Sequence, residues 1–124
     1  MNKTITAPNA PAAVGPYCHA KLVGGTLYTS GQIGLIPATG ELAQGVEAQA
    51  AQALDNLKAV LEAAGMGMED VVKTTVFLAD INDFATITAI YAGYFPNNPP
   101  ARSCVQAAAL PKGALFEIEA IAAK

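Results

Sequence analysis

The residues best suited to chemistry lie towards the C-terminal end of the chain, where the only arginine, Arg102, precedes Cys104 and Glu117. A guanidinium forms two parallel hydrogen bonds to a planar carboxylate, which an ammonium group does not match. Such charged hydrogen bonds contribute roughly 1.5–3 kcal/mol each, enough to select a class of organic acid. Glu117 is a candidate general base that holds a water molecule. The two side chains could equally form a structural ion pair, and the residue types alone leave both interpretations open.

Two strands are expected to position these side chains. Residues 100–122 contain two strand-like segments separated by Pro111-Lys112-Gly113, where a proline of fixed φ and a permissive glycine indicate a turn. Side chains alternate between the two faces of a strand, so Arg102 and Cys104 share one face of the first segment. A hairpin of this kind would bring the arginine close to a carboxylate such as Glu117.

The rest of the chain alternates between strand and helix patterns. The order β-β-α-β-α-β-β predicts one α+β domain over residues 1–124, with two helices on one face of a mixed sheet. Residues 1–16 and 35–45 are expected to contain no helix. The predicted elements are a hairpin over 17–30 with a Gly24-Gly25 turn, a helix over 46–64, a strand over 71–78 and a helix from Phe84 to Tyr94 that Pro96 stops.

Composition argues against several classes of function. Net charge is −3 with no basic cluster, which disfavours a nucleic-acid partner. No apolar run approaches the ~18 residues of a membrane span. The absence of a charged and then apolar leader predicts a cytoplasmic protein. Only 14% of residues are charged, against roughly 25% in typical soluble domains, and this predicts that a homo-oligomer covers the sheet face that carries no helices.

The single histidine and the two cysteines offer little chemistry of their own. They are too few to supply the four soft ligands of a zinc site, so no metal is expected. Cys18 and His19 are adjacent on a predicted strand and therefore point to opposite faces, which prevents a catalytic pair. Cys18 is interpreted as a small buried side chain, and pairing of Cys104 with His19 across a subunit boundary stays open.

Several segments together resemble the Rid family, the reactive intermediate deaminases, in its RidA branch. The likeness runs from about residue 10 to residue 122, nearly the whole chain. It implies a chorismate-mutase-like fold and a homotrimer with a ligand cleft at each subunit boundary. It also implies hydrolysis, without a cofactor, of 2-imino acids released by pyridoxal-phosphate dehydratases, to 2-keto acids and ammonia. The segments are Gly15–Tyr17, Tyr28–Ile33, Lys73–Phe77, Pro100–Val105 and Glu117–Ile121.

The resemblance implies a role for each matching residue. Arg102 would hold the substrate carboxylate, Glu117 would orient the attacking water, and Cys104 would lie beside the ligand. Tyr17, Ser30 and Gly31 would line the cleft. A protonated imine is already electrophilic, so its hydrolysis needs orientation more than a strong nucleophile. Thr88, where many relatives carry Asn, and a short connection at 96–99 leave the preferred imine side chain undecided.

Two other functions compete with imine hydrolysis. The same cleft could bind 2-keto acids or similar small molecules without turnover, as a sensor or storage module. A chaperone-like or nucleic-acid role is the third hypothesis, and the acidic composition weighs against RNA. The presence of both Arg102 and Glu117 favours catalysis over these alternatives.

Overall fold

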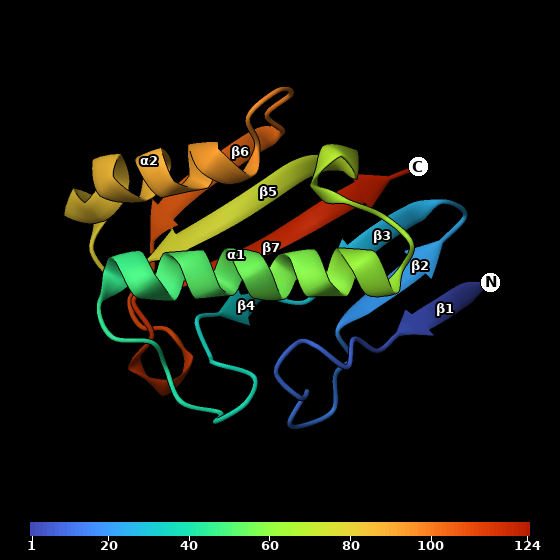
Figure 1. The fold of residues 1–124 in the computed structure, drawn as a ribbon, viewed down its shortest axis with the longest axis horizontal. Coiled ribbons are helices and arrows are strands. Elements are labelled where there is room, and N and C mark those ends of the chain that lie inside the picture. Colours follow the sequence, from blue (N-terminus) through green and yellow to red (C-terminus); the bar gives the residue numbers. More distant parts are fainter.

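A seven-stranded sheet with both helices packed on one of its faces forms the molecule (Figure 1). The computed structural model describes residues 1–124. It confirms the predicted α+β class and both predicted helices. The strands are β1 (Asn2–Ile5), β2 (Ala20–Val23), β3 (Thr26–Thr29), β4 (Gln32–Ile33), β5 (Val71–Leu78), β6 (Ala101–Gln106) and β7 (Phe116–Ala123), the helices are α1 (Val46–Ala63) and α2 (Phe84–Tyr94), and three 3₁₀ turns are η1 (Met68–Asp70), η2 (Ile81–Asp83) and η3 (Pro111–Gly113).

The order of strands corrects one prediction. The sheet runs β1-β2-β3-β7-β5-β6, with β4 also paired to β7, and only β5 and β6 are parallel. The expected hairpin between β6 and β7 is therefore wrong, because β5 lies between them. The predicted turn exists as η3, but it belongs to a connection over 107–115, longer than the two to five residues of a hairpin loop. That length lets the chain cross the end of β5.

Two short strands, β1 and β4, were not predicted from the sequence. Residues 1–16 contain no helix, as expected, but β1 pairs antiparallel with β2, with Ile5 opposite Ala20. The segment after β3 does not extend that strand. It forms β4, in which Gln32 pairs with Ile118 of β7. The hairpin between β2 and β3 is confirmed, and both turn glycines take positive φ values of 52° and 87°.

The helices begin and end where the local sequence predicts. Gly65 follows α1 with a φ of 76°, the left-handed conformation that commonly ends a helix. Asp80 caps η2, the 3₁₀ turn that leads into α2, since its Oδ1 accepts a hydrogen bond from the Asn82 N–H at 2.9 Å. The N-cap of α2 itself is Asp83, whose side chain makes no capping bond. The apolar stripe of α1 packs on β7, where Phe116 and Ile118 are fully buried. The fully buried stripe residues include Leu54, Leu57, Val60 and Leu61.

The other face of the sheet carries no helix (Figure 1). Side chains of Val23, Tyr28 and Val105 on this face are 43%, 50% and 47% exposed. In the paired strands, the charged Glu119 lies opposite Thr75 on the same face. This face is therefore a mixed surface with several large apolar side chains. Neither helix has the length and hydropathy that crossing a membrane requires.

Candidate active site

Arg102 lies on the helix-covered face of the sheet. It is paired in register with Thr74, which is fully buried beneath α2. The guanidinium lies over two aromatic rings of α2, with its carbon 5.1 Å from the Phe84 ring centroid and 4.8 Å from that of Tyr91. These distances are within the range of cation–π attraction. Phe84, Thr88 and Tyr91 follow one another at helical spacing, which is why one face of α2 presents all three to the arginine.

The hydrogen bonding of Arg102 leaves most of its donors free. Its Nη1 donates to Thr88 Oγ1 at 3.3 Å, and no carboxylate of the chain hydrogen-bonds to it. Arg102 and Glu117 therefore do not form the structural ion pair that was the alternative interpretation. A hollow of about 420 Å³ opens beside the guanidinium. It is lined by Thr88, Tyr91, Ala92, Phe95, Pro99, Pro100 and Arg102.

A buried hydroxyl pair fixes the ring beneath the guanidinium. Tyr91 Oη and Thr74 Oγ1 are 2.7 Å apart, with the two residues 6% and 0% exposed. Burial raises the pKa of Tyr91, despite the hydrogen bond to Thr74 and the nearby Arg102. The phenol is therefore neutral at physiological pH, and its hydroxyl is available to Thr74. Sequence reasoning assigned neither residue a role, although their positions on a strand and a helix facing each other follow from the fold.

Cys104 shares this face with Arg102 and packs against the core. Burial raises the pKa of its thiol, and the positive charge of Arg102 offsets this effect only in part. The side chain is therefore a protonated thiol at neutral pH, not a nucleophilic thiolate. It contributes shape next to the arginine.

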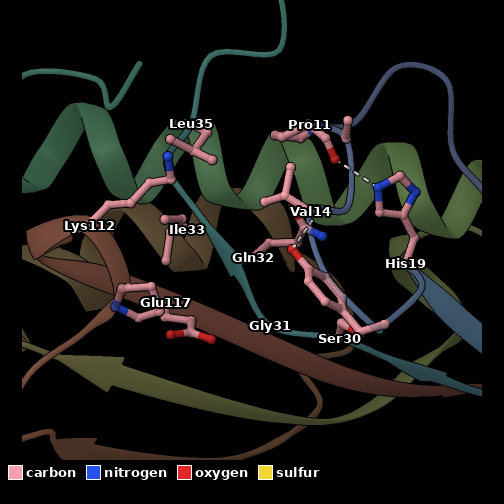
Figure 2. A pocket seen from close by; sticks show the side chains of 13 residues that line it. Pro11, Val14, His19, Ser30, Gly31, Gln32, Ile33, Leu35, Lys112 and Glu117 are labelled. Carbon is pink, nitrogen blue, oxygen red and sulfur yellow. Dashed lines mark hydrogen bonds between the residues drawn. The ribbon is translucent and has the colours of Figure 1, made fainter. Parts of the chain in front are cut away.

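Glu117 lies on the opposite face, in a second cavity of about 470 Å³ (Figure 2). Tyr17, Ser30 and Gly31 line this cavity with it, so four of the six predicted site residues come together here. The loop that presents them is fixed by Ser30, whose Oγ donates to the Cys18 carbonyl at 2.6 Å. The Val14 N–H donates to Tyr17 Oη at 3.4 Å.

The carboxylate of Glu117 is close to the backbone at Gly31. A methyl group added to Gly31 would collide with Glu117 Oε2, so only glycine allows this approach. No hydrogen-bond donor of the chain pairs with the carboxylate. Burial raises the pKa of Glu117, and the negative charge of Glu119 raises it further. Glu117 is thus a stronger base than an ordinary glutamate, and its oxygens are free to hold a water.

Two residues that sequence reasoning left without a role line the same cavity, namely His19 and Lys112. Lys112 is the one non-glycine residue with positive φ, at 58°. Both are labelled in Figure 2, where they approach the cavity from different sides. The predicted turn at Pro111-Lys112-Gly113 draws attention to Lys112. The cavity itself could not be predicted, because the connection that lines it crosses the end of β5 and does not form the expected hairpin.

The predicted site residues therefore fall into two groups. Arg102 and Cys104 face the helices, while Tyr17, Ser30, Gly31 and Glu117 surround the cavity on the other side of the sheet. The hairpin expected to join Arg102 to Glu117 is absent, so within one chain the two groups of predicted site residues stay apart.

The chain is similar over its whole length to several known proteins. The 2-iminobutanoate/2-iminopropanoate deaminase of Escherichia coli strain K12 is 54% identical over 127 residues, covering 100% of this chain and 99% of the relative. The crystal structure of RidA from the Antarctic bacterium Psychrobacter sp. PAMC 21119 has a TM-score of 0.96 at 48% identity, covering 98% of this chain and 99% of that one. E. coli TdcF with bound serine has a TM-score of 0.95 at 46% identity, covering 98% of each chain.

A family model described as Endoribonuclease L-PSP matches residues 7–124. Together with relatives about half identical over their full length, this match confirms the family indicated by the sequence segments around Arg102 and Glu117. The chain belongs to the Rid family, which is also described as the endoribonuclease L-PSP family.

Proposed function

We propose that this protein hydrolyses 2-iminobutanoate and 2-iminopropanoate to the corresponding 2-keto acids and ammonia. The E. coli relative bears the name of this activity and is 54% identical over the full length. The observation that carries the proposal is the state of Arg102, a guanidinium held by two rings and one hydroxyl without any carboxylate partner. A small organic acid supplies the missing carboxylate, and bidentate pairing fixes its orientation.

We call Arg102 with the hollow beside it, and Glu117 with its cavity, the two half-sites. Each half-site contributes one part of the reaction. Arg102 binds the carboxylate of the protonated imine, and Glu117 accepts a proton from water as the water oxygen attacks the imine carbon. The product of this step is a carbinolamine and a protonated Glu117. Glu117 passes that proton to the nitrogen, the C–N bond breaks and ammonia leaves. The Glu117 carboxylate, free again, takes the hydroxyl proton as the keto group forms and then releases it to the departing ammonia. The raised pKa of Glu117 makes it a better proton acceptor in the first step.

The two half-sites meet at an interface between copies of this chain, and the resemblance to the Rid family indicates a trimer. Three observations support this part of the proposal. Arg102 and Glu117 lie on opposite faces of one sheet, each beside its own cavity. The helix-free face exposes Val23, Tyr28 and Val105. Only 14% of residues are charged. Cyclic symmetry places the same pair of surfaces together at every boundary of a trimer.

Mixing two inactive variants tests this arrangement. We expect R102A and E117Q each to lose at least about a hundredfold in kcat/KM for 2-iminobutanoate, generated by a dehydratase in a coupled assay. Co-expressed in equal amounts, they form mixed oligomers in which about a quarter of the interfaces combine an intact Arg102 with an intact Glu117. The mixture should therefore recover about a quarter of the wild-type activity.

The outcomes separate the two parts of the proposal. Activity of the mixture that stays at the level of the single variants would contradict a shared site. An unchanged rate in R102A, or in the charge-preserving variant R102K, would remove the assignment of Arg102 and with it the proposed reaction. Wild-type protein mixed with each variant serves as the control for subunit exchange.

Binding without turnover is the second candidate function. The crystal structure of TdcF, 46% identical to this chain, contains serine, so a close relative binds an amino acid. Calorimetry with serine and with 2-ketobutanoate, combined with the coupled assay on the same protein, distinguishes the two functions. Binding of either ligand together with no acceleration of imine hydrolysis would favour a sensor.

A further inference from the structure

His19 joins the loop before β2 to the N-terminal segment of the chain. The side chain is 4% exposed. Its Nδ1 lies 2.8 Å from the backbone nitrogen of Ala7, and its Nε2 lies 2.7 Å from the carbonyl oxygen of Pro11. Figure 2 shows the second of these bonds at the edge of the cavity. One buried ring therefore holds two points of the same segment.

These two partners determine the protonation state of the ring. A backbone N–H can only donate, so Nδ1 must present its lone pair to Ala7. A carbonyl can only accept, so Nε2 must carry the hydrogen that points to Pro11. The imidazole is thus the neutral Nε2–H tautomer. An imidazolium ion carries hydrogen on both nitrogens and has no acceptor left for the Ala7 N–H.

The segment that His19 holds forms one wall of the Glu117 cavity. We call residues 7–14 the N-terminal wall, because Pro11, Ala12 and Val14 line the cavity. β1 ends at Ile5, so the wall has no sheet pairing of its own. Its side-chain ties are the two bonds to His19 and the weaker 3.4 Å bond from Val14 to Tyr17. Ala7 and Ala10 are also buried in the core. Loss of a bond to His19 therefore removes one of the few hydrogen bonds that fix the wall, while this apolar packing remains.

We propose that His19 is a positioning residue for the substrate cavity, and that its neutral form alone holds the N-terminal wall in place. Protonation of His19 breaks the bond to Ala7, loosens the wall and weakens ligand binding. The inference rests on the proposed function only for the choice of ligand.

Other ionisable groups share the cavity with His19. Tyr17 comes from the same loop, Lys112 from η3 and Glu117 from β7. The pKa of Glu117 is raised by burial, so its titration also contributes to the pH dependence of binding. The direct partners of His19 are main-chain atoms that do not titrate. A variant that keeps both hydrogen bonds but cannot protonate therefore isolates the contribution of His19.

The first experiment reads the tautomer directly in the unmodified protein. His19 is the only histidine, so long-range ¹⁵N–¹H NMR spectra contain a single imidazole. At about pH 7.5 we expect an unprotonated Nδ1 and a protonated Nε2. The pH is then lowered until the spectrum shows hydrogen on both ring nitrogens, and at that pH the Ala7 amide should exchange hydrogen faster relative to Leu27 in the core. An Nδ1–H tautomer, or an Ala7 amide that keeps its protection after the ring protonates, would overturn the inference.

The second experiment measures binding of 2-ketobutanoate by calorimetry at the same two pH values. H19Q retains one acceptor and one donor but does not titrate, while H19L loses both bonds. We expect acidification to raise the Kd of the wild type about fivefold more than that of H19Q, the effect of about one hydrogen bond. H19L should bind weakly at both values. Equal pH dependence of wild type and H19Q, with tight binding by H19L, would contradict the inference.

The two experiments also separate this inference from the proposed function. If 2-ketobutanoate bound to no form of the protein, the proposed ligand would be wrong. The tautomer of His19 and the exchange of the Ala7 amide would still decide whether the wall depends on a neutral imidazole.

Discussion

The two proposed half-sites of this chain differ in how many contacts hold the functional side chain of each. The guanidinium of Arg102 is fixed by two rings and a hydroxyl, and one of those rings is itself fixed by a buried hydrogen bond to Thr74. The carboxylate of Glu117 has no donor of its own and sits in an open cavity with a raised pKa. The guanidinium is thus held by several contacts, whereas the carboxylate is unpaired and more basic than usual.

This difference agrees with the tasks that we propose for the two groups. A binding group gains affinity when its geometry is set before the ligand arrives, because less entropy is lost on binding. A general base must instead exchange protons with water, so saturating its oxygens with fixed donors would lower its pKa and its basicity. Arg102, the proposed binding group, accordingly lies against α2, and Glu117, the proposed base, lies beside a cavity.

The largest effect is expected from adding one methyl group beside the base. G31A places a Cβ where Glu117 Oε2 now lies, so the carboxylate must move. Misplacing a catalytic group by about 1 Å can lower the rate about a hundredfold. We expect kcat for 2-iminobutanoate to fall by about that factor, with KM changed far less because Arg102 is untouched. Steady-state kinetics in the dehydratase-coupled assay provide the measurement.

The matched control for this variant is G93A. Gly93 lies in α2, and a Cβ there meets no atom within 4 Å. We expect unchanged kinetics and unchanged or slightly raised stability, since alanine favours a helix more than glycine. A G31A enzyme with normal kcat would show that the position of Glu117 is not critical.

A smaller effect is expected where the arginine half is fixed. T74V and Y91F each leave one buried hydroxyl without a partner, which costs about 1–3 kcal/mol of unfolding free energy. The double variant removes both hydroxyls, so its loss should be smaller than the sum of the two single losses. Denaturant unfolding of the four proteins measures this coupling. Strict additivity would contradict the importance of the hydroxyl pair.

The same variants also test whether the pair positions Arg102. Y91F retains the ring under the guanidinium but frees it from Thr74. We expect KM for 2-iminobutanoate to rise a few-fold while kcat changes little, because the arginine binds the carboxylate. T74S keeps a hydroxyl at position 74 and, unlike T74V, should therefore have the wild-type KM. A fall in kcat with unchanged KM would show that the hydroxyl pair does not act through binding of the carboxylate by Arg102.

Much of the fold could be predicted because its signals are local. The β-branched residues of β5, the apolar stripe of α1 and the glycines at 24, 25 and 65 act through neighbours in the sequence. The strand order could not be predicted in the same way. Nothing local shows that β5 inserts between β6 and β7, because this pairing depends on long-range competition among strands.

The site residues show the same division. Alternation along β6 correctly placed Arg102 and Cys104 on one face of the strand. The mistaken hairpin led to the expectation that Arg102 and Glu117 approach within one chain. The supports of the site, Thr74, Tyr91 and His19, were missed, because their roles come from contacts between segments 12 or more residues apart.

The smallest effect concerns the stability of the half that contains the base. Burial and Glu119 raise the folded-state pKa of Glu117 above its unfolded value. The folded state therefore binds more protons than the unfolded state between these two pKa values, and this group lowers stability as the pH rises through that range. E117Q removes the charge, so it should be more stable than wild type at pH 7, although inactive.

Solvent screening limits the gain from E117Q to less than about 1 kcal/mol, because the carboxylate is only half-buried. The gain should vanish below about pH 4, where an unfolded glutamate is also protonated. E119Q removes only the second cause and should give a smaller gain. Denaturant midpoints at pH 7 and pH 4 measure all three proteins. If E117Q were less stable than wild type at pH 7, the carboxylate would have a stabilising partner, and the contrast between a supported arginine and an unsupported base would not hold.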